Sequence, residues 1–161
     1  MDFSKLWQNF LDTVQNHYMD FNGRVGRAQF WYFVLVSIGV IVIVSIVAGI
    51  LHIGLLGPLA GLALLLPTGA LAARRIQDTG QNGSLVWIWI IASAINRFLA
   101  LMFFVAGPLG AIGFLFYFFS IGWLINLVEL VAAVALIYFC AQPGTAGPNQ
   151  YGAEPPIFAP N

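Results

Sequence analysis

Residues 74–83 read Arg74-Arg75-Ile76-Gln77-Asp78-Thr79-Gly80-Gln81-Asn82-Gly83, a polar island between two long apolar regions. Before it, the run from Ala28 to Ala73 has no charged residue and is roughly twice the ~20 residues that one helix needs to cross a bilayer. After it, the stretch from Leu85 to Ala141 carries charge only at Arg97 and Glu129. This pattern predicts an all-α, polytopic membrane protein with the polar island at one membrane face.

Composition points to the same class of protein. The chain has 161 residues, of which 60% are hydrophobic and 7% are charged, whereas a soluble domain has about 25% charged residues. The formal net charge is zero, so no basic field attracts nucleic acid. The single cysteine, Cys140, excludes an intrachain disulfide and a cysteine-cluster metal site, and we expect no cofactor or metal. The first twenty residues lack the apolar core of a signal peptide, so we expect insertion through the first span.

Residues 1–22 are predicted to form an amphipathic helix that lies in the membrane interface. One face carries apolar and aromatic residues at three- and four-residue spacing: Phe3, Leu6, Trp7, Phe10, Leu11, Val14, Tyr18 and Phe21. The polar face carries Lys5, Asn9, Asp12, Thr13, Asn16 and Asp20. We expect an anchor that covers the edge of the membrane domain, with a regulatory or lipid-sensing role as the alternative.

Residues 23–141 are predicted to form four membrane-spanning helices arranged as two hairpins. In the first hairpin, Arg24 and Arg27 precede an aromatic belt and a first span that runs to Leu51. Glycine and proline at residues 54–58 predict a short outer turn before the second span. Pro67 lies inside that second span and is expected to kink it, because proline has no N–H to donate.

The second hairpin follows the polar island. Its first helix is predicted to begin after Ser84, the expected cap, and to end near Ala106. Glycine and proline at residues 107–110 predict the second outer turn. The last span then runs from about Ala111 to Ala141, which is long for one crossing, so it must tilt, break near Gly122 or protrude.

The basic residues predict the orientation of the four spans. Two crossings return the chain to its starting side, which places five of the six basic residues on one face: Lys5, Arg24, Arg27, Arg74 and Arg75. By the positive-inside rule this face is cytoplasmic. Four crossings also bring the Pro/Gly-rich tail, residues 142–161, back to this side, so both termini are expected in the cytoplasm.

Arg97 and Glu129 are predicted to form an ion pair within the membrane. At ~1.5 Å per residue, each lies about 20 Å from the inner boundary, so they reach similar depth in an antiparallel hairpin. A lone charge at that depth costs about 3 kcal/mol or more. Asn96 and Asn126 are the expected additional partners. The cluster is either a proton- or solute-handling site or a polar contact that fixes the register of two helices.

Three separated motifs border the apolar spans: FNGRVGRAQFWYFVL at residues 21–35, RRIQDTGQNGS at 74–84 and QPGTAGPNQYGAEP at 142–155. Together they resemble the YhaH-like bacterial inner-membrane family called domain of unknown function 805. The matching residues are Gly23, Arg24, Arg27, Arg74, Arg75, Asp78, Thr79, Gly80, Gly83, Pro143, Gly144, Asn149, Tyr151, Gly152 and Pro155. The resemblance implies a multi-pass protein of the bacterial inner membrane.

Two positions depart from the family pattern. Gln77 stands where the family usually has histidine, and Glu154 stands where it usually has aspartate. The first departure argues against a histidine acid-base or metal role at that position.

The three motifs are predicted to meet at the cytoplasmic face. The candidate site there is a polar cluster of Arg24, Arg27, Arg74, Arg75, Asp78, Asn149 and Tyr151. Because guanidinium groups bind phosphate oxygens in bidentate fashion, this cluster is either a structural cap or a binding site for an anionic lipid, nucleotide or peptide. We expect membrane lipids with anionic headgroups as partners, and a homo-oligomer or another membrane protein as further candidates.

These features favour a non-enzymatic inner-membrane protein with a structural, envelope-maintenance or accessory role. The alternative is a small transporter or a lipid- or anion-handling protein that uses the arginine cluster and the Arg97–Glu129 pair. An enzyme is the least favoured class, because the sequence has no recognisable serine–histidine motif, no metal-ligand spacing and only six acidic residues.

Overall fold

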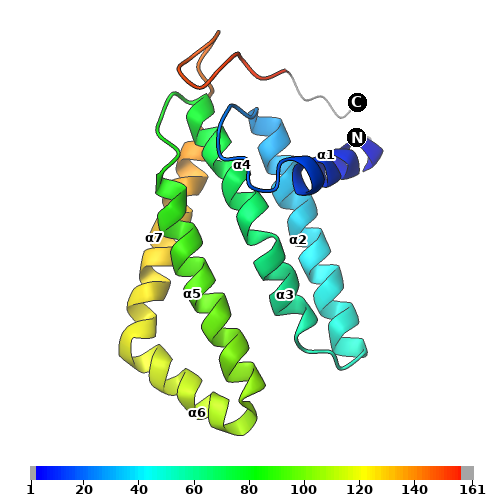
Figure 1. Ribbon diagram of the computed structural model, residues 1–161, viewed down its shortest axis with the longest axis vertical. Helices are drawn as coiled ribbons and strands as arrows, with labels where there is room; N and C mark the ends of the chain where they lie inside the picture. Colours follow the sequence, from blue (N-terminus) through cyan, green and yellow to red (C-terminus); the bar gives the residue numbers. More distant parts are fainter. Residues whose placement is uncertain (1–2, 157–161) are drawn as a thin grey trace.

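Four helices of membrane-spanning length and apolarity lie side by side in the computed structural model, which describes residues 3–156 (Figure 1). The spans are Arg27–Ile50, Leu56–Asp78, Leu85–Val105 and Gly107–Ala141. The predicted all-α polytopic fold is confirmed. The N-terminal helix and the C-terminal tail lie at the same end of the bundle, where Arg24 and Arg75 bind the tail. We call this the arginine end.

Helix α1 (Phe3–Asn16) lies across α2 and α4 at the arginine end (Figure 1). It ends before Tyr18 and Phe21, which the sequence placed in the helix. Asn9 and Thr13 are buried, so their assignment to the polar face was wrong. Each has a main-chain partner that allows burial, since Asn9 Nδ2 donates to the Gln29 carbonyl at 3.1 Å and Thr13 Oγ1 to the Asn9 carbonyl at 2.9 Å.

The first hairpin pairs α2 (Arg27–Ile50) with a second span that is interrupted at Leu64, between α3 (Leu56–Ala63) and α4 (Leu65–Asp78). The interruption follows from Pro67, as predicted. Proline has no N–H for the carbonyl four residues earlier, which is that of Ala63. The Tyr18 hydroxyl donates to this Ala63 carbonyl at 2.5 Å. The segment after α1 therefore satisfies the group that the proline leaves unpaired.

The second hairpin contains α5 (Leu85–Val105), α6 (Gly107–Tyr117), a π-helical turn η1 (Phe118–Gly122) and α7 (Trp123–Ala141). Of the three arrangements open to the last span, the break near Gly122 is the one present. Helix α6 runs obliquely across the far end of the bundle in place of the predicted simple turn (Figure 1). Ser84 makes no side-chain capping bond; its N–H donates to Asn82 Oδ1 at 3.0 Å.

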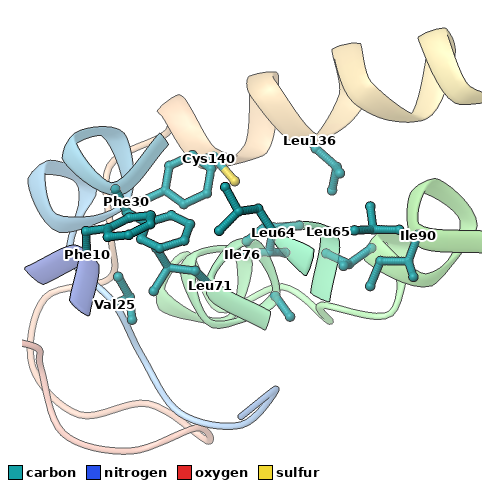
Figure 2. Close-up of a cluster of buried hydrophobic side chains, with 14 residues drawn as sticks. Phe10, Val25, Phe30, Leu64, Leu65, Leu71, Ile76, Ile90, Leu136 and Cys140 are labelled. Atoms are coloured by element: carbon teal, nitrogen blue, oxygen red, sulfur yellow. The ribbon is translucent and has the colours of Figure 1, made fainter. Parts of the chain in front are cut away.

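Helix α4 is the central element. In the most apolar 18 residues of the second span, 44% of the residues are buried, against 17% in each of the other three spans. The outer faces of those three spans are left for lipid. Buried side chains from α1, α2, α4, α5 and α7 meet around it (Figure 2). The labelled members of this core are Phe10, Val25, Phe30, Leu64, Leu65, Leu71, Ile76, Ile90, Leu136 and Cys140. The polar end of α4, residues 74–78, is therefore enclosed by neighbouring elements.

Candidate functional site

The polar island begins inside a helix. Residues 74–78 form the last turns of α4, whereas the sequence placed the end of the span at Ala73. Arg75 and Asp78 lie three residues apart on one helix face and form an ion pair. The pair allows the helix to extend into a buried position, since each charge has a partner there.

Asp78 binds two guanidinium groups. Its Oδ1 atom lies 2.9 Å from both Nε and Nη2 of Arg24 and accepts a hydrogen bond from Nε. Its Oδ2 atom accepts a hydrogen bond from Arg75 Nη1. The side chains of Arg24 and Arg75 are each 1% exposed, and that of Asp78 is 5% exposed. Charge-assisted bonds of this kind are about twice as strong as neutral ones. The loop before α2 is thereby tied to the end of α4.

The same residues hold the C-terminal tail. Arg24 donates to the carbonyls of Thr145 and Gly147, each at 2.6 Å. Arg75 donates to the carbonyl of Cys140 at 3.0 Å and to that of Gln142. In return, the Thr145 N–H and Oγ1 donate to the Asp78 carbonyl at 2.9 and 3.1 Å. We call Arg24, Arg75, Asp78 and Thr145 the clasp, because they join the loop before α2, the end of α4 and the tail.

Gly144 lies where the tail passes closest to the clasp. A Cβ atom at this position would collide with Asp78 Oδ2. The glycine of this third motif is therefore required by a close approach between the tail and the carboxylate.

Three further residues of the predicted cytoplasmic cluster lie beside the clasp, and one of them, Asn149, donates from Nδ2 to Thr145 Oγ1 at 2.9 Å. Arg74 Nη1 is 3.7 Å from Asp20 Oδ2. Asn149 Nδ2 donates to the Gln77 carbonyl at 3.0 Å, and the Tyr151 N–H donates to Asn149 Oδ1 at 2.8 Å. These residues fasten the loop before α2 and the turn of the tail to α4.

Gln77, the position that departs from the family pattern, also has a packing contact. Its Nε2 donates to the Phe21 carbonyl at 2.9 Å. The side chain is buried and holds the loop before α2 against α4.

A cavity of about 310 Å³ borders the clasp. Arg27 and Glu154 line it together with Arg24, Arg75 and Asp78. The side chain of Arg27 is exposed and makes no hydrogen bond or ion pair with residues 3–156. Glu154 accepts the Gly147 N–H at 2.8 Å and so helps to shape the tail. Arg27 is the arginine of this cavity that remains open to a ligand.

The second polar site lies between α5, α6 and α7. Arg97 Nη1 is 3.6 Å from Glu129 Oε1, so the predicted contact is present. Glu129 also accepts Ser93 Oγ at 2.6 Å and Asn96 Nδ2 at 2.5 Å. A cavity of about 370 Å³ adjoins the group. Hydrogen bonds from the two neutral side chains stabilise the half-buried carboxylate alongside Arg97.

Asn126 makes a different hydrogen bond from the one expected. Asn126 lines the same cavity as Asn96, Arg97 and Glu129, as predicted for the cluster, but its Nδ2 donates to the Gly122 carbonyl at 2.7 Å and not to the ion pair. The π-helical turn explains this, since the bond supports the main chain at the junction of η1 and α7.

Sequence reasoning missed several members of these sites. Ser93 lies three and four residues before Asn96 and Arg97, so helical spacing could have identified it. Tyr117, which donates to Asn96 Oδ1 at 2.5 Å, comes from α6, whose oblique course had no signal in the sequence. No group of three potential metal ligands occurs within the described part of the chain.

Comparison with known proteins agrees with this architecture. The family described as "Protein of unknown function (DUF805)" matches residues 18–153. The chain belongs to this family.

Two curated relatives of this DUF805 protein, both from Escherichia coli K12, are named as inner membrane proteins. Inner membrane protein YhaI is 34% identical over 150 residues, covering 92% of this chain and 95% of the relative. Inner membrane protein YhaH is 28% identical over 158 residues, covering 92% and 96%. The uncharacterized protein YiiR of the same organism is 27% identical over 143 residues, covering 88% and 90%. No solved structure matches the chain.

Proposed function

We propose that this DUF805 protein is a non-enzymatic component of the bacterial inner membrane with a structural, envelope-maintenance or accessory role. One observation carries the proposal. Leu71, Ile90 and Leu136 belong to one buried apolar cluster (Figure 2), and along α5 and α7 the last two lie seven residues from Arg97 and Glu129, on the side of the arginine end. A transport route across the membrane requires polar or hydrated lining along its length. The apolar cluster on this side of Arg97 and Glu129 favours the structural role.

The hydrogen bonds and ion pairs within the clasp support the same structural role. Arg24, Arg75 and Asp78 bind one another and the tail, so little of their surface remains for a substrate. A fixed tail would present a constant surface to anionic lipid headgroups, to a second copy of the chain or to another membrane protein. With five of the six basic residues expected on one face, we place this surface and both termini in the cytoplasm.

A second candidate function is that of a small transporter or a lipid- or anion-handling protein. The open Arg27 beside the 310 Å³ cavity favours anion binding at the arginine end. The 370 Å³ cavity beside Arg97 and Glu129 would supply a second polar binding site within the membrane.

Flux measurements on reconstituted protein separate the two candidates. Proteoliposomes would be loaded with a pH-sensitive dye or with radiolabelled inorganic phosphate, and compared with vesicles that lack the protein. The structural role predicts equal rates with and without the protein. A faster flux that is lost in Glu129→Gln would overturn that role and establish transport. In a strain that lacks the protein, the structural role also predicts increased uptake of a hydrophobic dye, reversed by the wild-type chain.

A further inference from the structure

An apolar groove of about 350 Å³ lies between α2 and α7. Trp31, Val34 and Ile38 of α2 form one wall, and Ala133 and Ile137 of α7 form the other. Its floor includes Thr68 and Ala72 of α4, whose small side chains leave the space between the walls. The groove has the apolar lining that suits a hydrocarbon chain.

Arg27 is placed at the arginine end of this groove. It precedes Trp31, Val34 and Ile38 by four, seven and eleven residues, which puts all four on one face of α2. At ~1.5 Å per residue, Arg27 and Ile38 are about 16 Å apart along the helix. This length is close to half of the ~30 Å hydrocarbon core, which is the depth of one leaflet.

The charges at the mouth of the groove favour an anionic occupant. Three guanidinium groups, those of Arg24, Arg27 and Arg75, and two carboxylates, those of Asp78 and Glu154, line the 310 Å³ cavity, which reaches α2 about one helical turn before the groove begins. Asp78 is already bound by Arg24 and Arg75. The five groups sum to one positive charge, and Arg27 is the guanidinium among them that has no ion-pair partner in residues 3–156. Its planar guanidinium matches two phosphate oxygens.

We propose that the groove binds one acyl chain of an anionic phospholipid and that Arg27 binds its phosphate. Trp31, which is 36% exposed, lies one turn from Arg27, at the depth where tryptophan side chains meet the headgroup region. The lipid belongs to the leaflet at the arginine end. This inference goes beyond the proposed structural role and does not depend on it, because a bound lipid is compatible with a protein that transports nothing.

Native mass spectrometry on the full-length protein tests the site. The protein would be reconstituted with equal amounts of phosphatidylglycerol and phosphatidylethanolamine that carry identical acyl chains, and the retained lipids would be counted. Wild type should retain phosphatidylglycerol in preference. Arg27→Gln should lower the retained ratio of the two lipids by about tenfold, as expected for the loss of one charge-assisted hydrogen bond. Arg27→Lys should restore part of the ratio.

A matched pair of substitutions tests the groove. Ala133 and Ala135 are both half-buried on α7, but Ala133 lines the α2–α7 groove and Ala135 lines a separate groove against α5. Ala133→Leu should reduce retention of both lipids, whereas Ala135→Leu should leave it at the wild-type level. Lys5→Gln, which removes one positive charge from α1, should also leave the ratio unchanged.

The proposal is overturned if Arg27→Gln keeps the wild-type preference, or if Ala133→Leu and Ala135→Leu behave alike. Thermal unfolding of each variant shows whether a loss of lipid reflects a loss of fold. Arg27 has no protein partner among the described residues, so its variant should unfold at the wild-type temperature.

Discussion

Asp78 carries the strongest electrostatic contacts at the arginine end. It compensates two buried guanidinium groups, those of Arg24 and Arg75. Asp78→Asn keeps the shape of the side chain but leaves both positive charges unbalanced. Removing one partner of a buried ion pair costs about 3–5 kcal/mol, and we expect a loss of this size in the free energy of unfolding in detergent.

The matched control for Asp78→Asn is Glu154→Gln. Glu154 is also a carboxylate at the arginine end, but it accepts only a main-chain N–H, that of Gly147, among the described residues. Its variant should cost no more than about 1 kcal/mol. Equal losses in the two variants would contradict the role assigned to Asp78.

Arg97 and Glu129 form a looser pair, at 3.6 Å. Ser93 and Asn96 hold the Glu129 carboxylate by hydrogen bonds, so Glu129→Ala also strands these two donors. A double-mutant cycle of Arg97→Ala and Glu129→Ala isolates the contribution of the ion pair itself. Unfolding in detergent should give a coupling energy of about 1 kcal/mol between the two residues. Additive effects of the two substitutions would show that the contact contributes nothing to stability.

The interrupted second span depends on a contact from outside it. Tyr18, which follows α1, donates to the Ala63 carbonyl that Pro67 leaves without its usual donor. Tyr18→Phe should lower the free energy of unfolding by about 0.5–1.5 kcal/mol, because the Ala63 carbonyl loses its hydrogen-bond donor. Unfolding in detergent measures the effect, and Tyr138→Phe, which alters an exposed tyrosine on α7, serves as the control.

A second substitution isolates the cause. Pro67→Ala restores an N–H that can donate to the Ala63 carbonyl. In the Tyr18→Phe background it should recover much of the lost stability. If it does not, the Tyr18 hydroxyl stabilises the protein through some other contact.

The return of the tail closes the arginine end of the bundle. Cys140, the only cysteine, is fully buried there, next to the carbonyl groups that Arg75 binds. Its reaction with a maleimide therefore reports opening of this end. Arg24→Gln should increase the labelling rate severalfold, because it releases the carbonyls of Thr145 and Gly147.

Arg27→Gln is the matched control for this labelling experiment. It removes the same charge three residues along the chain, from a side chain that has no partner within residues 3–156. Its labelling rate should equal that of wild type. An increase in both variants would indicate a general effect of charge in place of release of the tail.

Much of this architecture follows from local properties of the sequence. Hydrophobic runs of membrane-spanning length predict the number of spans, because every main-chain polar group in lipid must be satisfied within a helix. Pro67 predicts the interruption of the second span, because the missing N–H is a property of the proline itself and does not depend on tertiary contacts. Residue counts within α5 and α7 also place Arg97 and Glu129 at equal depth, because a straight helix converts position into distance.

The choice among polar partners could not be predicted in this way. The first two motifs contain four arginines, yet Asp78 binds Arg24 and Arg75 and leaves Arg27 open. Asn126 supports η1 and makes no hydrogen bond to Glu129. Hydropathy and helical spacing identify polar residues and their depth, but their partners depend on how α4 is enclosed and on where the distant tail returns. These are long-range contacts, and only the packed bundle sets their geometry.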